Sequence, residues 1–170
     1  MDCLPERPPG RIIKQIPHVE EAIQRLQELQ NTDEVEAAQS LLVRMISIDE
    51  ASFCSVFPFA QPQTLQTPDI MGRTLLHYAA ALGKLSALSL LLSCDAVDTN
   101  ARDDAGDTPL HLAAGNGERG TCELLLGHSR VDRTVQDDLG RTALDVAHSA
   151  AAHYFATEAV HALARKAIAT

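Results

Sequence analysis

The C-terminal part of the chain repeats itself at one fixed interval, and this periodicity constrains the fold more than any other feature of the sequence. Segments that begin at Asp69, Asp103 and Asp137 align without gaps, and the interval from one of these aspartates to the next is the repeat period. Glycine and threonine recur at fixed places in all three segments, at Gly72, Gly106 and Gly140 and at Thr74, Thr108 and Thr142. A period of this length is one supersecondary unit that buries its apolar face by stacking on its copies, so the pattern predicts a repeat solenoid.

Each of the first two copies carries the signals of a pair of helices. The hydroxyls of Thr74 and Thr108 can accept an N–H bond from a first helical turn, and Pro109 fits a first helical position, where no donor is needed. Small alanines follow, and a triple-leucine run comes later in each copy, at 90–92 and at 124–126. Aromatic residues make up only 4% of the chain, which favours helices over a β-sandwich.

The segments GRTLLHYAA (72–80) and GDTPLHLAA (106–114) resemble the fingerprint of ankyrin repeats, G-x-T-P-L-H-x-A-A. The resemblance implies an all-α repeat solenoid, in which helix-turn-helix units alternate with β-hairpin-like loops. It is strong in the first two copies and weaker in the third. The repeat domain that it implies covers residues 69–170, with repeats at 69–102, 103–136 and 137–168.

The resemblance also assigns roles to the histidines of the fingerprint and to the last copy. It implies that His77 and His111 each form a hydrogen bond with the threonine three residues before them. In the third copy Ala143 replaces the proline and Asp145 replaces the histidine, as often happens in a final repeat. We therefore expect the chain to end in a cap whose outward face is polar, with His153, Thr157, Glu158, Arg165 and Lys166.

Residues 113–120, AAGNGERG, contain a literal G-x-G-x-x-G, which would indicate an enzyme if it formed a dinucleotide site. Such a site needs a preceding β-strand and an acidic residue about 20 positions further on, where Asp137 stands. Only the middle glycine, Gly117, has a counterpart in the previous copy, Gly83. Since the preceding residues predict a helix and Asp137 is the recurring first residue of a copy, we predict that these glycines only turn the chain.

No other pattern indicates catalysis or a bound metal. The acidic run at 98–107 misses the register of a calcium loop, and the spacing of His148, His153 and His161 points them in different directions on a helix. Nothing such as G-x-S-x-G organises a nucleophile. We therefore expect no enzyme activity, no cofactor, no metal site and no small-molecule substrate.

Charge and composition exclude further classes of partner. The net charge is −9 and no basic cluster is present, which argues against nucleic acid and anionic membranes. No stretch approaches the roughly 20 apolar residues of a membrane-spanning helix. The cysteines, Cys3, Cys54, Cys94 and Cys122, form no C-x-x-C pair, which favours reduced thiols. We expect a soluble protein of the cytoplasm or nucleus whose partner is another protein.

The part of the chain before Asp69 is less regular. Residues 1–17 contain four prolines and predict a flexible N-terminal segment. Apolar residues at helical spacing predict a helical hairpin over 18–48, which we interpret as a degenerate repeat or an N-terminal cap. Residues 49–68 form a connection that contains proline and three of the four phenylalanines. This connection either packs back on the helices or docks a partner.

Ankyrin repeats bind other proteins, and the resemblance implies that the concave side of the solenoid does so here. Ile70, Met71, Leu82 and Leu139 are apolar where water would be expected, a pattern typical of an interface. Alternatively, the N-terminal region folds over this side and buries them. The implied partner-binding residues are Ile70, Met71, Arg73, Leu82, Asp104, Ala105, Asp107, Asn116, Asp138, Leu139 and Arg141.

The functional hypothesis is a non-catalytic protein-interaction module that acts as an adaptor, an inhibitor or an assembly factor. The alternative is a regulatory ankyrin domain of a larger enzyme or signalling protein. The resemblance implies one modification as well, asparaginyl hydroxylation of Asn100, because Asp98 and Leu92 stand at the spacing of that modification. Asparagine is also common at this place for turn geometry alone, so a structural role stays open.

Overall fold

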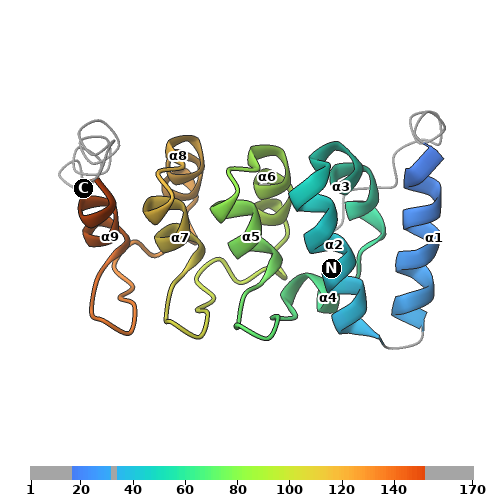
Figure 1. The fold of residues 1–170 in the computed structure, drawn as a ribbon, viewed down its shortest axis with the longest axis horizontal. Coiled ribbons are helices and arrows are strands. Elements are labelled where there is room, and N and C mark those ends of the chain that lie inside the picture. Colours follow the sequence, from blue (N-terminus) through green and yellow to red (C-terminus); the bar gives the residue numbers. More distant parts are fainter. Residues whose placement is uncertain (1–16, 32–33, 152–170) are drawn as a thin grey trace.

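The structure is a computed structural model that describes residues 17–31 and 34–151, which form a linear array of short helices (Figure 1). Within the described residues no strand is present, and Gln136 and Thr142 form an isolated bridge. This confirms the prediction of an all-α repeat fold. The elements are α1 (Pro17–Asn31), α2 (Val35–Ile48), α3 (Glu50–Val56), the 3-10 helix η2 (Phe57–Phe59), α4 (Pro62–Gln66), α5 (Leu75–Ala81), α6 (Leu85–Ser93), α7 (Pro109–Gly115), α8 (Arg119–Gly127) and α9 (Ala143–Ala151).

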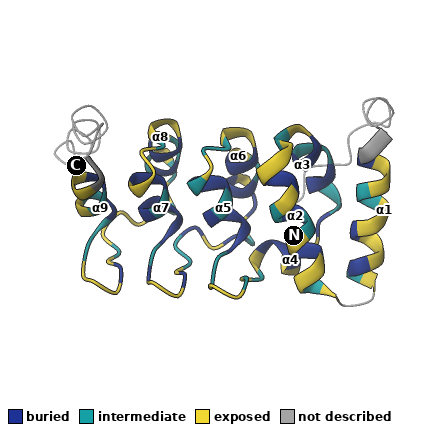
Figure 2. Cartoon of the chain, viewed as in Figure 1, coloured by how far each residue is buried: buried dark blue, intermediate teal, exposed yellow. Residues whose placement is uncertain are grey.

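Helices of the same kind stack along the array. The first helices of the repeats, α5, α7 and α9, pack on one another, and the second helices α6 and α8 do the same. The loops that precede α5, α7 and α9 all extend from the same edge of the array (Figure 1). Buried residues line the facing sides of the helices, whereas the tips of the loops are largely exposed (Figure 2).

The first helix of each repeat begins with a reciprocal side-chain cap. The N–H of Thr74 donates to Nδ1 of His77 over 3.1 Å, and the N–H of Thr108 donates to Nδ1 of His111 over 3.2 Å. The threonine side chains accept from the backbone of the same histidines, which completes a capping box in both helices. These bonds agree with the pairing that the fingerprint implies. In the third repeat the carboxylate of Asp145 takes the place of the imidazole and accepts from the N–H of Thr142 over 2.9 Å.

The same histidines bind each repeat to the next one. Because Nδ1 of His77 accepts a hydrogen bond, its proton lies on Nε2, which faces the carbonyl oxygen of Asp107 at 3.1 Å. Nε2 of His111 lies 3.0 Å from the carbonyl oxygen of Arg141 in the same way. His77 is fully buried, and burial lowers its pKa below the usual value of 6.5. A neutral imidazole therefore satisfies one backbone group in each of two neighbouring repeats.

The helix pair before the first recognised repeat continues the register of the repeats. Leu41 and Leu42 of α2 stand one repeat period before Leu75 and Leu76 of α5, and α2 packs on α5 as α3 packs on α6. Nε2 of Gln39 donates to the carbonyl oxygen of Arg73 over 3.2 Å, the bond that the histidines make further along. The two helices expected over 18–48 are present as α1 and α2, which pack on each other, but the pair that stacks in the repeat register is α2 with α3.

Segment 49–68 contains helices and belongs to the core. Phe53 and Phe57 are fully buried, with ring centroids 5.7 Å apart. Oε1 of Glu50 accepts from the N–H groups of Ser86 over 2.7 Å and of Ala87 over 2.9 Å, so α3 caps the start of α6. The helix α3 is only seven residues long and carries Phe53 where the later repeats carry Ala87 and Thr121, so the segment does not show the repeat pattern in sequence.

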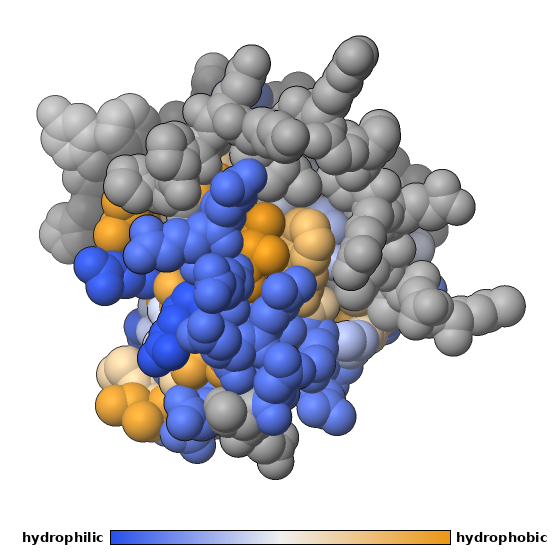
Figure 3. Space-filling model, turned by 90° about the vertical axis from the view of Figure 1, so that its right-hand side faces the viewer, coloured by the Kyte–Doolittle hydropathy of each residue, from blue (hydrophilic) through white to orange (hydrophobic). Residues whose placement is uncertain are grey.

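The outermost helix closes the N-terminal end of the array. Val19, Leu26 and Leu29 of α1 are buried against α2 and α3, while its other side carries exposed charged and amide residues. Viewed from this end, the described surface is mostly hydrophilic (Figure 3). This is the polar outer face that a solenoid needs at its end. The expected flexible segment before Pro17 and the expected polar cap after Ala151 lie outside the described residues.

We predict that the junction made by His77 weakens in mild acid. The unfolded chain binds a proton near pH 6.5, whereas the folded chain holds this imidazole neutral to a lower pH. Protons therefore favour the unfolded chain, and the stability that His77 contributes is present above pH 6.5 and is lost as the pH falls below it. Urea unfolding of the wild type and of His77→Gln should differ by about 2 kcal/mol at neutral pH and by clearly less at about pH 5.5.

When the free energies of unfolding of the two proteins are compared at the same pH, the contribution of the carboxylates cancels, because they titrate alike in both. A difference that stays constant or grows on acidification would contradict a neutral, buried His77.

We also predict that Phe53 is essential to the stability of the array. Phe53→Ala removes a fully buried ring and should lower the free energy of unfolding by about 3–5 kcal/mol. Phe59→Ala is the matched control, since this ring is only half-buried and its loss should cost distinctly less. Chemical denaturation followed by circular dichroism measures both, and equal losses would contradict the greater contribution that we assign to the buried ring of Phe53.

Candidate functional site

Three hairpin loops project from the array, and each is closed by its own aspartate. The N–H groups of Asp69, Asp103 and Asp137 each donate to the carbonyl four residues on, over 2.9 Å in all three loops. Oδ1 of each aspartate accepts from two N–H groups inside the loop, at 2.8–3.0 Å. The glycine in each turn has φ between 74° and 78°, a conformation that only glycine adopts without strain. The three loops therefore have one well-defined shape.

The tips of the hairpins are hydrogen-bonded to one another. The N–H of Asp104 donates to the carbonyl of Met71 over 3.0 Å, and the N–H of Asp138 donates to the carbonyl of Ala105 over 3.1 Å. The tips thus form one continuous surface that crosses all three repeats. We call it the tip row, and it consists of Ile70, Met71, Asp104, Ala105, Asp138 and Leu139.

The apolar residues expected at an interface are exposed, but they form two groups. Ile70 (98% exposed), Met71 (51%) and Leu139 (75%) belong to the tip row. Leu82 lies at the opposite end of α5, about 10 Å away along a helix of seven residues. It is 43% exposed, so no described part of the N-terminal region buries either group.

Two further exposed apolar residues, which were not predicted from the sequence, accompany Leu82. Ile48 ends α2 and stands one repeat period before Leu82, and Leu85 begins α6. Their exposed fractions are 72% and 46%. Extending the register into α2 would have found Ile48. We call Ile48, Leu82 and Leu85 the helix-end group.

Several of the predicted polar site residues are engaged inside the protein. Asn116 donates from Nδ2 to the carbonyl of Ala81 in the preceding repeat, over 2.9 Å. Each arginine of the hairpins has a carboxylate partner. The pairs are Arg73 with Asp103 at 3.4 Å, Arg102 with Asp138 at 2.7 Å and Arg141 with Asp137 at 2.7 Å.

Asp107 is the exception among the charged residues of the hairpins. It is half-buried and lies one repeat period from both Arg73 and Arg141, so a carboxylate occupies the place of an arginine. Its Oδ1 atom is buried and accepts no hydrogen bond from any described residue. Burial, and then the neighbouring charge of Asp103, raise the pKa of the Asp107 carboxyl. The folded chain therefore disfavours the charge that Asp107 carries at neutral pH.

The glycine motif lacks the surroundings of a dinucleotide site. The glycines of the literal G-x-G-x-x-G follow helix α7, where a dinucleotide fold has a strand. Gly115 ends α7, Gly117 turns the chain with φ 72°, and Gly120 lies within α8. No group of three His, Cys, Asp or Glu side chains in this part of the chain could hold a metal ion.

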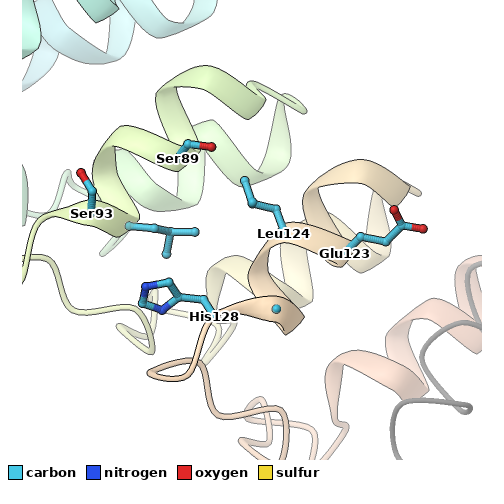
Figure 4. Close-up of a pocket in the computed structure, with 7 residues that line it drawn as sticks. Ser89, Ser93, Glu123, Leu124 and His128 are labelled. Carbon is cyan, nitrogen blue, oxygen red and sulfur yellow. The ribbon is translucent and has the colours of Figure 1, made fainter.

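A cavity of about 370 Å³ lies between the second helices α6 and α8, away from the hairpins. Figure 4 shows Ser89 and Ser93 on α6 and Leu124 on α8, with His128 at the C-terminal end of α8. The carboxylate of Glu123, which also lines the cavity, is paired with Arg119 at 3.0 Å. The cavity is open to solvent and its surface is more apolar than polar, and its position away from the hairpins makes it a useful control surface.

Asn100, the expected hydroxylation site, is held at both ends of its amide. Nδ2 donates to the carbonyl of Arg130 over 2.8 Å, and Oδ1 accepts from the N–H of Asp132 over 2.7 Å. The guanidinium of Arg130 in turn donates to the carbonyls of Leu92 at 2.7 Å and Cys94 at 3.1 Å, at the end of α6. Asn100 therefore joins the loops of two repeats.

Comparison with known proteins identifies the repeat. A family model described as ankyrin repeats, in three copies, matches residues 76–169, which is more than half of the chain. No curated protein matches the chain. No helix in the described ranges is both long and apolar enough to cross a membrane.

We predict that removing the charge of Asp107 stabilises the fold. Asp107→Asn keeps the shape of the side chain but removes a charge that burial and Asp103 disfavour. The gain in the free energy of unfolding should be below about 1 kcal/mol, since solvent screens a half-exposed group. Asp104→Asn, at the exposed tip, should change it by less than about 0.5 kcal/mol. Urea unfolding at neutral pH measures both, and a loss for Asp107→Asn would mean that the carboxylate has a partner.

Proposed function

Since the chain belongs to the ankyrin-repeat family, whose repeats are general protein-interaction modules and typically non-catalytic, we propose that it binds a partner protein through the tip row. The partner would lie across the hairpins and along the exposed side of α5, α7 and α9, the concave side of an ankyrin solenoid. In this proposal, occupying the partner's surface is the whole mechanism, as in an adaptor, an inhibitor or an assembly factor.

The exposure of the tip row carries this proposal. Ile70 and Leu139 are 98% and 75% exposed, although water disfavours such side chains. Backbone bonds between the tips and the three aspartates hold these residues in place before any partner arrives. A preformed surface loses little conformational entropy on binding, which favours affinity.

Half-buried side chains on the first helices extend this surface toward the helix-end group. Tyr78 on α5 and Leu112 on α7 occupy the variable place between the histidine and the alanines of the fingerprint. The hydroxyl of Tyr78 donates to Oδ2 of Asp69 over 2.5 Å, so the ring lies beside the base of the first hairpin. We include both residues in the proposed binding surface with Ile48, Leu82 and Leu85.

The second candidate is a regulatory ankyrin domain of a larger enzyme or signalling protein. The family match does not distinguish the two candidate functions, because the family model covers only the repeats. The two differ in one respect: a self-contained module binds its partner alone, whereas a regulatory domain acts on a catalytic domain attached to it.

We further propose that the protein acts in the cytoplasm or nucleus, where Cys54, Cys94 and Cys122 would stay reduced, as they are in the structure. Hydroxylation of Asn100 stays a proposal, and it would require release of the amide from Arg130 and Asp132. A mass increase of one oxygen on the Asn100 peptide from cell-derived protein would support it, and an unmodified peptide would remove it.

Affinity capture from cell extract tests the proposed binding surface. We expect the intact chain to retain a partner that Met71→Glu combined with Leu139→Glu loses, because both changes place charge on the exposed apolar tips. Ser89→Glu combined with Ser93→Glu is the matched control, since it adds the same two charges beside the cavity between α6 and α8. Circular dichroism verifies that all three proteins are equally folded.

A partner retained by the tip variant but lost by the serine variant would move the site to the other face. Leu82→Glu, tested separately, shows whether the same partner reaches the helix-end group.

A further inference from the structure

The tip row changes character from one repeat to the next. Ile70 and Met71 make the first tip apolar and Leu139 makes the third tip apolar on one side. Between them, the second tip presents Asp104 and Ala105, which are both exposed. A partner that crosses the row therefore meets an apolar, then an acidic, then an apolar surface.

The second hairpin also carries the largest excess of negative charge. Residues 68–73 hold one acid and one base, whereas residues 102–107 hold three acids and one base. The single base, Arg102, is committed to Asp138 in the next hairpin. Neither Asp104 nor Asp107 has an ion pair or a side-chain hydrogen bond among the described residues. The centre of the row therefore keeps negative charge that the chain does not neutralise.

Asp107 marks where a cation is missing. The equivalent residues in the flanking repeats are Arg73 and Arg141, and each lies on a buried carboxylate, that of Asp103 or Asp137. Asp107 has the same two carboxylates as neighbours and adds a third negative charge to them, which the charge of Arg141 offsets only in part. An external guanidinium or ammonium group at Asp107 would restore the alternation of charges that the flanking repeats have.

We propose that the tip row, together with Asp107 at the base of the second hairpin, binds a protein segment that places an arginine or lysine on Asp107 and an apolar side chain on either side of it. This inference rests on the proposed function and specifies the chemistry of the partner. One apolar side chain contacts Ile70 and Met71, and the other contacts Leu139. Neighbouring repeats lie roughly 8–10 Å apart, which an extended chain spans in about three residues. The segment therefore carries its apolar residues about three positions before and after the cation.

Selection of displayed random peptides on the full chain tests this. Peptides of about twelve residues are long enough to cross the three tips at about 3.3 Å per residue. We expect the enriched peptides to carry an arginine or lysine with apolar residues at that spacing. Their affinity should fall at least about tenfold for Asp107→Arg and by a smaller factor for Asp107→Asn. Glu21→Arg, which makes the same charge change on α1 at the end of the array, should bind them unchanged.

The outcomes separate this inference from the proposed function. Peptides without a basic residue, or peptides bound equally by wild type and Asp107→Arg, overturn the inference. If those peptides are still lost by Met71→Glu with Leu139→Glu, the tip row remains the binding surface with a different partner chemistry. If neither set of changes affects binding, both proposals fall. Asp107→Asn fits the same space as the aspartate, so its result stands even if the arginine variant folds poorly.

Discussion

Three backbone carbonyls, those of Arg73, Asp107 and Arg141, hold the array together because each accepts a hydrogen bond from the repeat before it. Each carbonyl closes its own hairpin as well, by accepting from the aspartate that begins the loop. One oxygen atom thus joins the shape of a hairpin to the position of the preceding helix pair. An error in stacking would leave the buried side chains of Gln39, His77 and His111 without their acceptors, at a cost of about 1–3 kcal/mol each.

The hairpins are conformationally ordered because of this arrangement. Loops on a protein surface are ordinarily mobile, and a binding surface built from them loses entropy when a partner fixes them. Here the aspartate side chains close each loop from within, and the bonds from Asp104 to Met71 and from Asp138 to Ala105 close the gaps between loops. The residues at the tips are therefore free to vary in chemistry, since none of these bonds uses their side chains.

The fold could be predicted from sequence most fully where chemistry repeats, and outside the repeats the helical spacing predicted α1 and α2. The repeat period, the threonine caps and the histidine pairs all follow from residues that recur at the same spacing. The degenerate repeat of α2 and α3 was missed because Gln39 makes the histidine's bond from a different place in the helix, and Asp49 turns the chain where a later repeat uses Gly83. Exposure of the tips was expected from the pattern. The absence of an ion pair for Asp107 among the described residues could not be expected from the sequence, since it depends on which arginine pairs with which carboxylate in three dimensions.

The substitution of glutamine for histidine at the first junction makes the array uneven along its length. Stability in a solenoid is a sum over its units and the interfaces between neighbours, so folding and unfolding can begin at one end and stop at an internal boundary. An amide does not titrate, whereas the imidazole of His77 does. Protonation of His77 therefore weakens the interface beyond α5, whereas the Gln39 bond before α5 does not depend on this titration. The junctions within the block from α1 to α6 use Gln39 and Glu50 and no imidazole, so we expect this block, closed on the outside by a polar helix, to be the last part of the array to open in mild acid.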